Sequence, residues 1–307
     1  MKILIILAAY NGEKYIKEQI DSILSQKDVS LDILIFDDAS KDLTIDVVKK
    51  FSNDNRIKLI INPIGTGSAA NNFFHAIQEI PNKTFEKYDY ISLSDQDDIW
   101  LSNKLKVATE CLQKNNASLY CSNLNLWEEA TNTQSIINKS HKQKEYDYLF
   151  ESGSAGCTYV FTKDFCLELK EKIKKINYLE WKFFSHDWFI YFLARINKHT
   201  VFIDSNAYIK YRMHTNNLHG YLNKKTFRAS IERLKVIQSG WYQEHIKGFN
   251  QLLHNAPVEK NIYKMYTKNY FSRLFVIIRY NFSLNRSFKK NIQFFIISTL
   301  PILRKTT

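Results

Sequence analysis

The first hundred residues alternate between two hydrophobic patterns. Short apolar runs, each of the length of a strand buried on both faces, occur at residues 3–7, 31–36, 57–61 and 88–93. Between them, apolar residues recur at helical spacing, at residues 15–24, 45–51 and 68–80. This alternation predicts βαβ units, a parallel sheet with right-handed crossovers, and therefore an α/β fold.

The pattern is more broken in the rest of the chain. "SLYCSNLNLW", "GCTYVF", "HTVFID" and "AYIKYRMH" predict strands, and the polar residues 128–147 predict a surface loop near an acceptor site. "SHDWFIYFLARI" predicts a helix whose opening Ser-His-Asp, residues 185–187, is suited to N-capping. From about residue 222 onward the spacing is helical throughout, which predicts a C-terminal helical appendage.

Polar residues gather where each of the first four predicted strands ends. They comprise Tyr10-Asn11-Gly12, Asp37-Asp38, residues 62–67 and residues 95–98. Ligands bind at the carboxyl ends of the strands in open α/β sheets, so these clusters are expected to converge on one crevice. Loops are generally polar, and this alone could account for any single cluster. It accounts less well for polar clusters at four successive strand ends.

The charge of the chain is divided unevenly. Hydrophobic residues make up 45% and charged residues 24%, which is an ordinary globular balance. Residues 221–307 contain 16 Lys or Arg against 3 Asp or Glu, whereas residues 1–220 contain 27 against 28. The formal net charge of +12 therefore resides in the C-terminal region, which implies two regions with different roles.

Cysteine usage and hydropathy predict a cytoplasmic protein that is soluble or peripheral to a membrane. The four cysteines, Cys111, Cys121, Cys157 and Cys166, form no C-x-x-C pair, which favours reduced and mostly buried thiols. The opening "MKILIILAAY" has features of a signal peptide, but its apolar run is short and is followed by an amphipathic helical pattern, so a buried first strand is the better interpretation. No stretch reaches the roughly 18 apolar residues of a membrane span.

Three carboxylates lie within "LSDQDDIW", at Asp95, Asp97 and Asp98. A divalent cation that bridges two phosphates would relieve their repulsion, and Mg²⁺ prefers one or two carboxylates together with substrate phosphates. A bare D-x-D pattern is common by chance, and such residues can also decorate a solvated turn. Their position at the end of the fourth predicted strand favours a cation site.

Other polar residues have both a structural and a chemical interpretation. Asp37-Asp38 could bind the base or ribose of a nucleotide or form an Asx turn, and for Asp37 alone the turn is favoured. Asp187 could cap a helix or act as a general base toward an attacking hydroxyl. A histidine such as His214 in "YRMHTNN" is more often a packed or surface residue than a ligand, although Arg212 beside it would suit a diphosphate.

Together these motifs are more specific than any one of them. In chain order they are "AAYNG", "FDDASKD", "LSDQDDIW", "SHDWFIYFLA" and "YRMHTNNLHG". Over residues 2–220 the chain resembles family 2 glycosyltransferases, the inverting nucleotide-sugar enzymes, and in particular their bacterial rhamnosyltransferase-like subgroup. The resemblance implies the GT-A fold, a Rossmann-like and mostly parallel sheet flanked by helices. It implies a catalytic domain at residues 1–220, followed by a basic, aromatic-rich helical region at residues 221–307.

The resemblance implies which residues bind the nucleotide of the donor. Asp38 would contact the base, with Ala9, Tyr10 and Asn11 nearby. Asn72 matches the family's Asn-Phe pair, although the preceding loop in "NPIGTGSAANNF" is longer than the family's usual version.

The resemblance also implies which residues carry the chemistry. Asp95 would contact the ribose or a metal-bound water, and Asp97 would hold Mg²⁺ or Mn²⁺ against the diphosphate. His214 would lie near the metal or the diphosphate, where Arg212 is also expected. Asp187 would be the catalytic base.

The implied reaction moves a sugar, with inversion, from a nucleotide diphosphate donor to a hydroxyl of a cell-surface polysaccharide or a lipid-linked glycan precursor. The subgroup suggests dTDP-rhamnose, and a UDP-hexose or UDP-N-acetylhexosamine is the alternative. A nucleic-acid-binding protein would also use a basic, tyrosine-bearing stripe, but the acidic crevice would repel a polyanion. A catalytically silent scaffold would not need all three acidic positions, Asp38, Asp97 and Asp187.

The C-terminal region combines cations with aromatic and aliphatic clusters such as "YFSRLFVIIRYNF". Helices of this kind can lie on an anionic membrane, here the inner face of the plasma membrane, because apolar faces enter the interface while cations meet the lipid head groups. The same region could instead pack on the catalytic domain or on a second subunit of a homo-oligomer. The sequence leaves these two interpretations open.

Overall fold

The computed structural model describes residues 1–213 and 235–300. The chain divides into two compact units. Unit 1 comprises Met1–Ser140, Gly153–Leu179 and Ser185–Arg212, and unit 2 comprises His141–Ser152, Glu180–Phe184 and Met213–Thr307. The domain boundary predicted near residue 220 falls outside the described residues.

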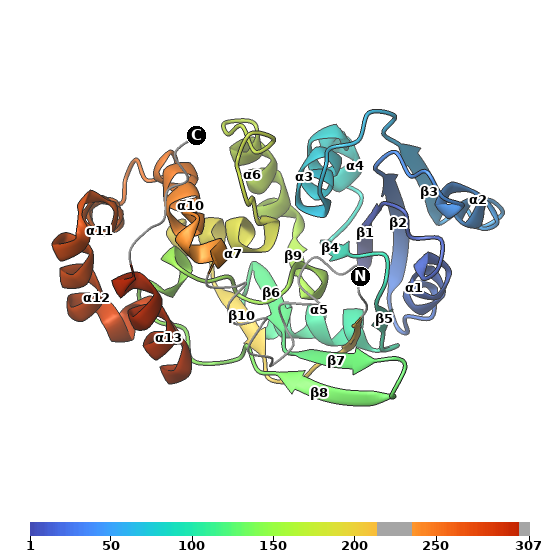
Figure 1. Ribbon diagram of the computed structural model, residues 1–307. Coiled ribbons are helices and arrows are strands. Elements are labelled where there is room, and N and C mark those ends of the chain that lie inside the picture. Colours follow the sequence, from blue (N-terminus) through green and yellow to red (C-terminus); the bar gives the residue numbers. More distant parts are fainter. Residues whose placement is uncertain (214–234, 301–307) are drawn as a thin grey trace. The chain divides into compact units, whose positions relative to one another are not determined.

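Unit 1 is built on a seven-stranded sheet with the order β10-β6-β9-β4-β1-β2-β3 (Figure 1). Its strands are β1 (Lys2–Ala9), β2 (Ser30–Asp37), β3 (Ile57–Ile61), β4 (Tyr90–Ser94), β6 (Leu119–Ser122), β9 (Val160–Thr162) and β10 (Val201–Asp204). Every pairing is parallel except those of β9, which runs antiparallel to β4 and β6. The predicted α/β fold with a mostly parallel sheet is confirmed.

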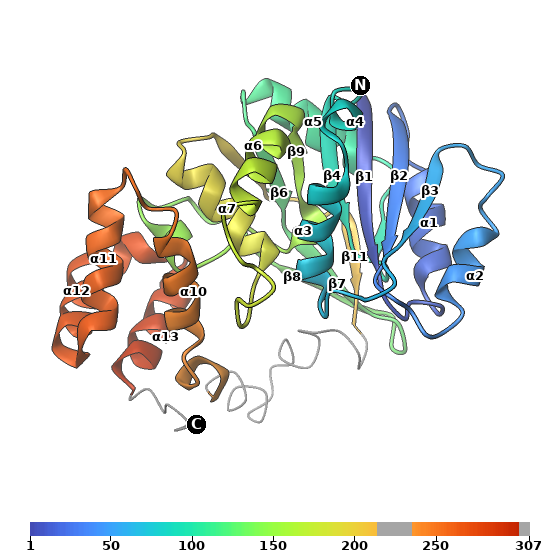
Figure 2. The same cartoon turned by 90° about the horizontal axis from the view of Figure 1, so that it is seen from above.

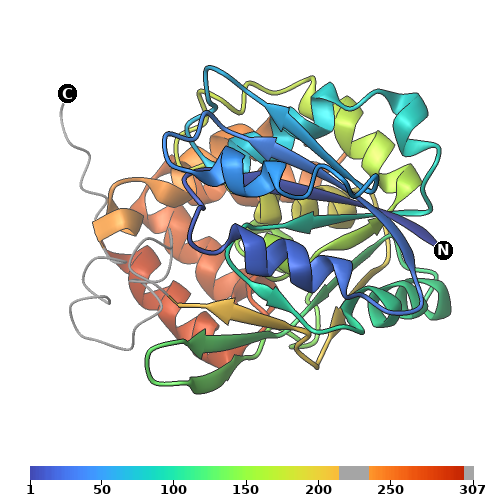
Figure 3. The same cartoon turned by 90° about the vertical axis from the view of Figure 1, so that its right-hand side faces the viewer.

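Helices cover both faces of this sheet (Figures 2 and 3). On one face α3 (Ala69–Glu79), α6 (Lys163–Ile173) and α7 (His186–Ile196) pack against one another and against the strands. On the other face, α1 (Ile16–Leu24) and α5 (Lys104–Lys114) share a core with alternate residues of β1, namely Ile3, Ile5 and Leu7. α2 (Thr44–Lys49) packs against α1, and α4 (Asn82–Phe85) precedes β4. Strand β1 reads as a continuous apolar run because both of its faces are buried.

A second sheet of unit 1 has the order β5-β11-β7-β8. Its strands are β5 (Ile99–Trp100), β7 (Leu124–Glu128), β8 (Thr133–Ile137) and β11 (Ile209–Arg212). Strand β8 lies within the polar segment that was predicted to be a loop, and that prediction was wrong. Most of its residues are exposed, and it is held by antiparallel backbone pairing with β7, so no burial pattern marks it in the sequence.

Two predicted strands are also shorter or more divided than expected. "SLYCSNLNLW" forms β6 and β7, which belong to different sheets. The chain changes direction at Asn123, whose amide nitrogen donates to the Ser205 carbonyl (2.7 Å) and whose Oδ1 accepts the Lys139 backbone N–H (2.6 Å). "GCTYVF" contributes only its end to β9, because Gly156–Thr158 forms a 3-10 turn, η2.

The described part of unit 2 is helical, as the spacing predicted. It contains η1 (Asp147–Leu149), α10 (Trp241–Asn250), α11 (Pro257–Lys268), α12 (Tyr270–Leu284) and α13 (Phe288–Thr299). The ring of Phe150 lies 4.8–5.9 Å from the rings of four aromatic residues, Tyr242, Tyr263, Tyr266 and Phe294. Among the described residues, no helix combines the length and the apolar character needed to cross a membrane.

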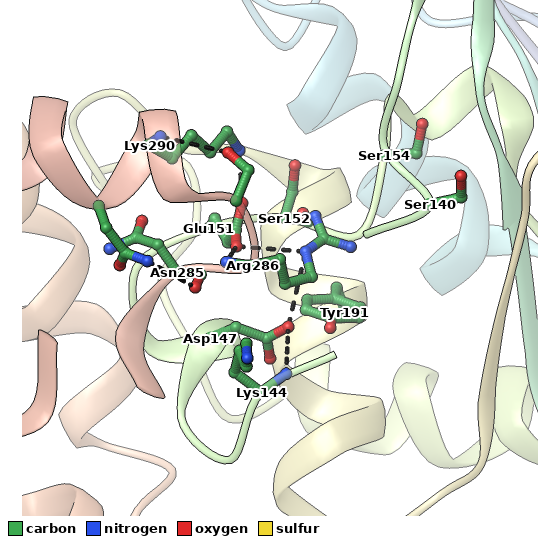
Figure 4. A network of polar contacts seen from close by, with 12 residues as sticks. Ser140, Lys144, Asp147, Glu151, Ser152, Ser154, Tyr191, Asn285, Arg286 and Lys290 are labelled. Carbon is green, nitrogen blue, oxygen red and sulfur yellow. Dashed lines mark hydrogen bonds and ion pairs between the residues drawn. The ribbon is translucent and has the colours of Figure 1, made fainter. Parts of the chain in front are cut away.

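A buried ionic network ties the segment around η1 to the helices of unit 2 (Figure 4). The Nε of Arg286 lies 3.2 Å from Glu151 Oε1 and 3.5 Å from Asp147 Oδ2, and Lys290 bonds the other oxygen of Glu151. Burial alone would raise the pKa of Glu151, but Lys290 and Arg286 outweigh it and lower this pKa to about 2. Glu151 therefore stays ionised in the folded protein.

We expect Glu151→Gln to destabilise the protein by about 3 kcal/mol at neutral pH, because it removes the carboxylate shared by Arg286 and Lys290 and leaves the buried Arg286 with the more distant Asp147. The stabilisation from Glu151 is fully present above the unfolded pKa near 4.5 and is lost as the pH falls toward about 2. Denaturant unfolding monitored by circular dichroism between pH 3 and pH 7 measures this difference. Glu145→Gln, an exposed change in the same segment, is the control and should change stability little. Equal stability of the two variants at pH 7 would contradict the assignment.

Candidate active site

The loop after β1 is held by side chains from two other strand ends. The Gln96 amide nitrogen donates to the Tyr10 carbonyl, and the Tyr10 backbone N–H donates to Gln96 Oε1, both at 2.8 Å. The Lys41 backbone N–H donates to Asn11 Oδ1 at 2.8 Å, which joins this loop to the one after β2. A Cβ at Gly12 would lie 2.2 Å from Gln96 Oε1, so a larger residue there would displace the Gln96 side chain from Tyr10. Ala9 is buried, whereas the ring of Tyr10 is 53% exposed.

Asp37 and Asp38 are both buried, and each accepts hydrogen bonds from a different loop. Asp37 is fully buried and accepts hydrogen bonds from the Ser40 backbone N–H (3.0 Å) and hydroxyl (2.5 Å), so the favoured turn interpretation of Asp37 is confirmed. Asp38 accepts from the Thr66 backbone N–H (2.7 Å) and from the Asn62 amide nitrogen (3.2 Å). Asp38 therefore orders the loop between β3 and α3 at the rim of the sheet.

Asn72 has a structural role that the resemblance did not imply. Its side chain is buried and its amide nitrogen donates to the Phe36 carbonyl of β2 at 2.8 Å. The side chain thus ties α3 to the sheet behind Asp37-Asp38. The expected contact of Asn72 with the nucleotide stays a prediction.

The acidic loop after β4 concentrates negative charge. Burial, followed by the charges of Asp97 and Asp187, raises the pKa of Asp95 to about 7. Burial, Asp97 and Asp95 raise the pKa of Asp98 well above its usual value. Ligand atoms of Asp95, Asp98 and Cys157 all lie within 4.8 Å of one another. The carboxylates are therefore crowded enough that a cation would stabilise their ionised forms.

The oxygen atoms of this loop fit Mg²⁺ or Mn²⁺. Hard divalent ions take carboxylate oxygens, and Asp95 and Asp97 would supply them. Cys157 is a soft ligand, and burial together with Asp98 and Asp95 raises the pKa of its thiol, so the thiol donates toward Asp98 instead. A bound ion would act as a Lewis acid toward the departing diphosphate.

A buried lysine lies beneath the acidic loop. Lys104 is 1% exposed, its Nζ donates to the Ser92 hydroxyl (3.2 Å), and it lies 3.5 Å from the centre of the Trp100 ring. Burial lowers the pKa of Lys104 to about 7, although Cys157 and Asp98 act in the opposite direction. With a pKa of about 7 the Lys104 amine is only partly protonated at neutral pH, and it lies near Asp98 inside the core.

Arg212 is 1% exposed and forms hydrogen bonds to the acidic loop through its backbone and its side chain. Its backbone N–H donates to Asp98 Oδ1 (3.2 Å) and its Nε donates to the Asp97 carbonyl (3.0 Å). The guanidinium also pairs with Glu18 and with Glu129, the latter at 2.6 Å. It lies between the rings of Tyr15 (4.6 Å) and Trp127 (4.7 Å). These contacts show that Arg212 is bonded to the acidic loop, and its expected contact with a diphosphate stays a prediction.

We expect Arg212→Lys to raise the Mn²⁺ concentration for half-maximal activity by about 10–100-fold, as for other residues that position metal ligands. Lysine keeps the charge but cannot bond two carboxylates and a carbonyl from one planar group. Lys210→Met, which removes a cation from the same strand, should change this concentration by no more than about twofold. An unchanged Mn²⁺ dependence in Arg212→Lys, with an unchanged melting temperature, would show that the contacts of Arg212 do not position the carboxylates of the acidic loop.

Asp187 lies in the first turn of α7, as the motif predicted. Its Oδ1 accepts hydrogen bonds from the Ser185 hydroxyl and from the Trp188 backbone N–H (2.7 Å). The Tyr159 hydroxyl donates to the Asp187 carbonyl (3.1 Å) and to the Ser154 carbonyl (3.2 Å), which braces the start of the helix. Both of these bonds to the carboxylate end on Oδ1.

The structure brings several predicted site residues together. After burial, the charges of Asp97 and Asp187 contribute to the raised pKa of Asp95, so these three carboxylates are close enough to interact electrostatically. Asp38 ends the neighbouring part of the same sheet rim, because β2 and β4 both flank β1 in parallel. His214 lies outside the described residues.

Solved structures with the same fold include complexes with a nucleotide and with a nucleotide sugar. TarS of S. aureus (residues 1–349, in complex with UDP) superposes with a TM-score of 0.58 at 16% identity, covering 97% of this chain and 89% of that one. The mannosyltransferase PcManGT of Pyrobaculum calidifontis, in complex with GDP-Man and Mn²⁺, superposes with a TM-score of 0.52 at 12% identity, covering 96% and 83%. The architecture is therefore the GT-A fold of nucleotide-sugar glycosyltransferases.

Sequence relatives narrow the class to one family. The Glycosyl transferase family 2 model matches residues 4–167. The dTDP-rhamnosyl transferase RfbG of Shigella flexneri is 36% identical over 266 residues, which are 86% of this chain and 90% of the relative. The UDP-Glc:alpha-D-GlcNAc-diphosphoundecaprenol beta-1,3-glucosyltransferase WfgD of Escherichia coli is 34% identical over 161 residues, which are 51% of this chain and 58% of the relative. The chain belongs to glycosyl transferase family 2 and is a glycosyltransferase.

Proposed function

We propose that this glycosyltransferase moves rhamnose from dTDP-rhamnose, with inversion, to a hydroxyl of a cell-surface polysaccharide or lipid-linked glycan precursor. The observation that carries the chemistry is the cluster of Asp95, Asp97 and Asp187 at one rim of the sheet. The choice of donor is supported by RfbG, which matches along most of both chains. UDP-glucose is the second candidate, supported by WfgD over about half of this chain.

In the proposed reaction the acceptor hydroxyl attacks the anomeric carbon from the face opposite the diphosphate. A bond forms between the acceptor oxygen and that carbon while the bond from the carbon to the diphosphate oxygen breaks, which inverts the configuration. Asp187 takes the proton of the hydroxyl and the dTDP leaves with the bonding electron pair. Mg²⁺ or Mn²⁺, when held by Asp97 and Asp95, stabilises the charge on that leaving group.

The donor nucleotide is proposed to lie along the strand ends. Asp38 would accept the imide N–H of the base, because its two oxygens offer more acceptor sites than Thr66 and Asn62 occupy. The exposed ring of Tyr10 would cover the base, while Ala9 and Asn11 shape the loop beneath it. His214 would approach the diphosphate, in keeping with the motif.

We place the reaction in residues 1–220 and assign residues 221–307 to attachment at the inner face of the plasma membrane. A lipid-linked precursor would be presented at that surface. This assignment is consistent with the concentration of positive charge after residue 220.

A thermal-shift screen with Mn²⁺ tests the donor. dTDP-rhamnose at 100 times its Kd should stabilise the protein by about 2.7 kcal/mol, because a ligand that binds only the native state shifts the folding equilibrium. UDP-glucose, UDP-N-acetylglucosamine and GDP-mannose at equal concentration should shift the melting temperature less. A larger shift with UDP-glucose would replace dTDP-rhamnose by the second candidate, and no shift with any nucleotide sugar would overturn the proposed donor site.

A further inference from the structure

Helices α12 and α13 of unit 2 expose apolar side chains along their lengths. On α12 these are Phe271 (79% exposed), Phe275 (56%), Ile278 (66%) and Phe282 (66%). On α13 they are Phe288 (70%), Ile292 (46%), Phe295 (38%) and Ile296 (53%). Residues at spacings of three and four lie on one side of a helix, so each set forms a stripe. We call these eight residues the α12–α13 face.

The exposed apolar residues of the α12–α13 face are not the residues that these helices bury. The two helices pack against each other and bury other positions, which on α13 are Asn291, Phe294 and Ser298. Two of these three buried residues are polar, whereas the exposed stripe of the same helix is apolar. A helix that only covered a core would show the reverse arrangement. Exposed apolar surface on this scale marks an interaction site.

The charge around the α12–α13 face has one sign. From Lys260 to Thr307 the chain contains ten Lys or Arg and no Asp or Glu. On α11, α12 and α13 the exposed cations are Lys260, Lys264, Lys268, Arg279 and Lys289. A partner of matching chemistry therefore has a negatively charged surface beside an apolar phase.

The exposed apolar side chains and the positive charge beside them together favour one kind of binding partner. A second copy of the chain, joined through this face by a twofold axis, would bring the same cations against one another. A nucleic acid would satisfy the cations but would offer no apolar phase for the phenylalanines. An anionic bilayer satisfies both, because its head groups are negative and its acyl boundary accepts aromatic and aliphatic side chains.

We propose that the α12–α13 face docks the enzyme on an anionic lipid bilayer, with its phenylalanine and isoleucine side chains in the interface and Lys268, Arg279 and Lys289 at the lipid phosphates. The docking deepens the proposed function, on which it rests only for the lipid-linked acceptor. In this arrangement the helices lie in the plane of the membrane and do not cross it.

Co-sedimentation of the full chain with vesicles tests the docking without any nucleotide sugar, so its outcome is separate from that of the donor screen. The protein should bind vesicles of phosphatidylcholine with phosphatidylglycerol, bind phosphatidylcholine alone more weakly, and dissociate as salt is raised. Phe271→Ser with Phe282→Ser should lower the partition coefficient at least about tenfold, since interfacial binding scales with buried apolar area. Lys268→Gln with Arg279→Gln should lower binding to the anionic vesicles only.

The matched control removes exposed apolar residues from unit 1. Leu43 and Leu179 are 61% and 59% exposed, and Leu43→Ser with Leu179→Ser should leave vesicle binding unchanged. Melting temperatures of both double variants show that each is folded. Equal losses of binding in the two double variants would overturn the proposal. So would a homodimer in light scattering that Phe271→Ser with Phe282→Ser dissociates while the wild type ignores anionic vesicles.

Discussion

Replacing Asp187 with asparagine is expected to lower kcat by about 10²–10⁴-fold, the usual contribution of a positioned general base. Asparagine has the same shape, so donor affinity should stay within about twofold of the wild-type value. The physical reason is that the acceptor hydroxyl loses the only group assigned to take its proton, while the groups that bind the nucleotide are unchanged. Steady-state kinetics with varied donor, together with calorimetric titration of dTDP, measures the two quantities separately.

The competing explanation for any effect is loss of a helix cap, and the chain offers a matched control for it. Asp164 lies two residues after the N-cap Thr162 of α6, as Asp187 lies two residues after the N-cap Ser185 of α7. Asp164 is exposed, so Asp164→Asn removes the same charge from the same helix position without touching the site. It should change stability by up to about 1 kcal/mol and leave kcat alone. Near wild-type kcat in Asp187→Asn would remove Asp187 from the role of base.

The core of unit 1 could be predicted because its strands are recognisable from their local sequence. Strands β1 to β4 are apolar runs bounded by turn residues, and the predicted run at residues 57–61 coincides with β3 (Ile57–Ile61). The second sheet carried no such signal, since β8 is an exposed edge strand and β5 has two residues. Among the described strands, β8 pairs only with its neighbour β7, and β5 pairs with β11, which lies more than 100 residues farther along the chain.

In the site, too, local motifs could be recognised in the sequence, whereas contacts between distant residues could not. Asp95, Asp97 and Asp187 could be predicted because their motifs are short and fall at strand ends or a helix start. Arg212 was predicted near the diphosphate, but its contacts with Asp97 and Glu18 were not predicted, since these residues are 115 and 194 positions away. Lys104 gave one signal that could have been used. It opens the amphipathic helix α5 on the side of the buried Leu105 and Ala108, where a lysine is unexpected.

These contacts explain how one loop carries three carboxylates. Arg212 bonds Asp98 and the Asp97 backbone, while Lys104 lies behind them in the core. These contacts order the loop at the end of strand β4 without a ligand. Preorganised groups of this kind are more effective in a water-poor site, because no reorganisation is needed during the reaction.

If the loop serves to hold a cation, Asp97→Asn should lower kcat/KM by about a hundredfold or more, since Lewis-acid stabilisation supplies several kcal/mol and each 1.36 kcal/mol is tenfold in rate. The amide has one neutral oxygen in place of a charged carboxylate, so the Mn²⁺ concentration for half-maximal activity should rise, and excess Mn²⁺ should restore part of the activity. Asp46→Asn, an exposed change of equal charge on α2, should match the wild type. Wild-type activity that survives chelation by EDTA would exclude a metal role for Asp97. In that case the raised pKa of Asp95 would point to a proton, instead of a cation, as the group that neutralises the loop.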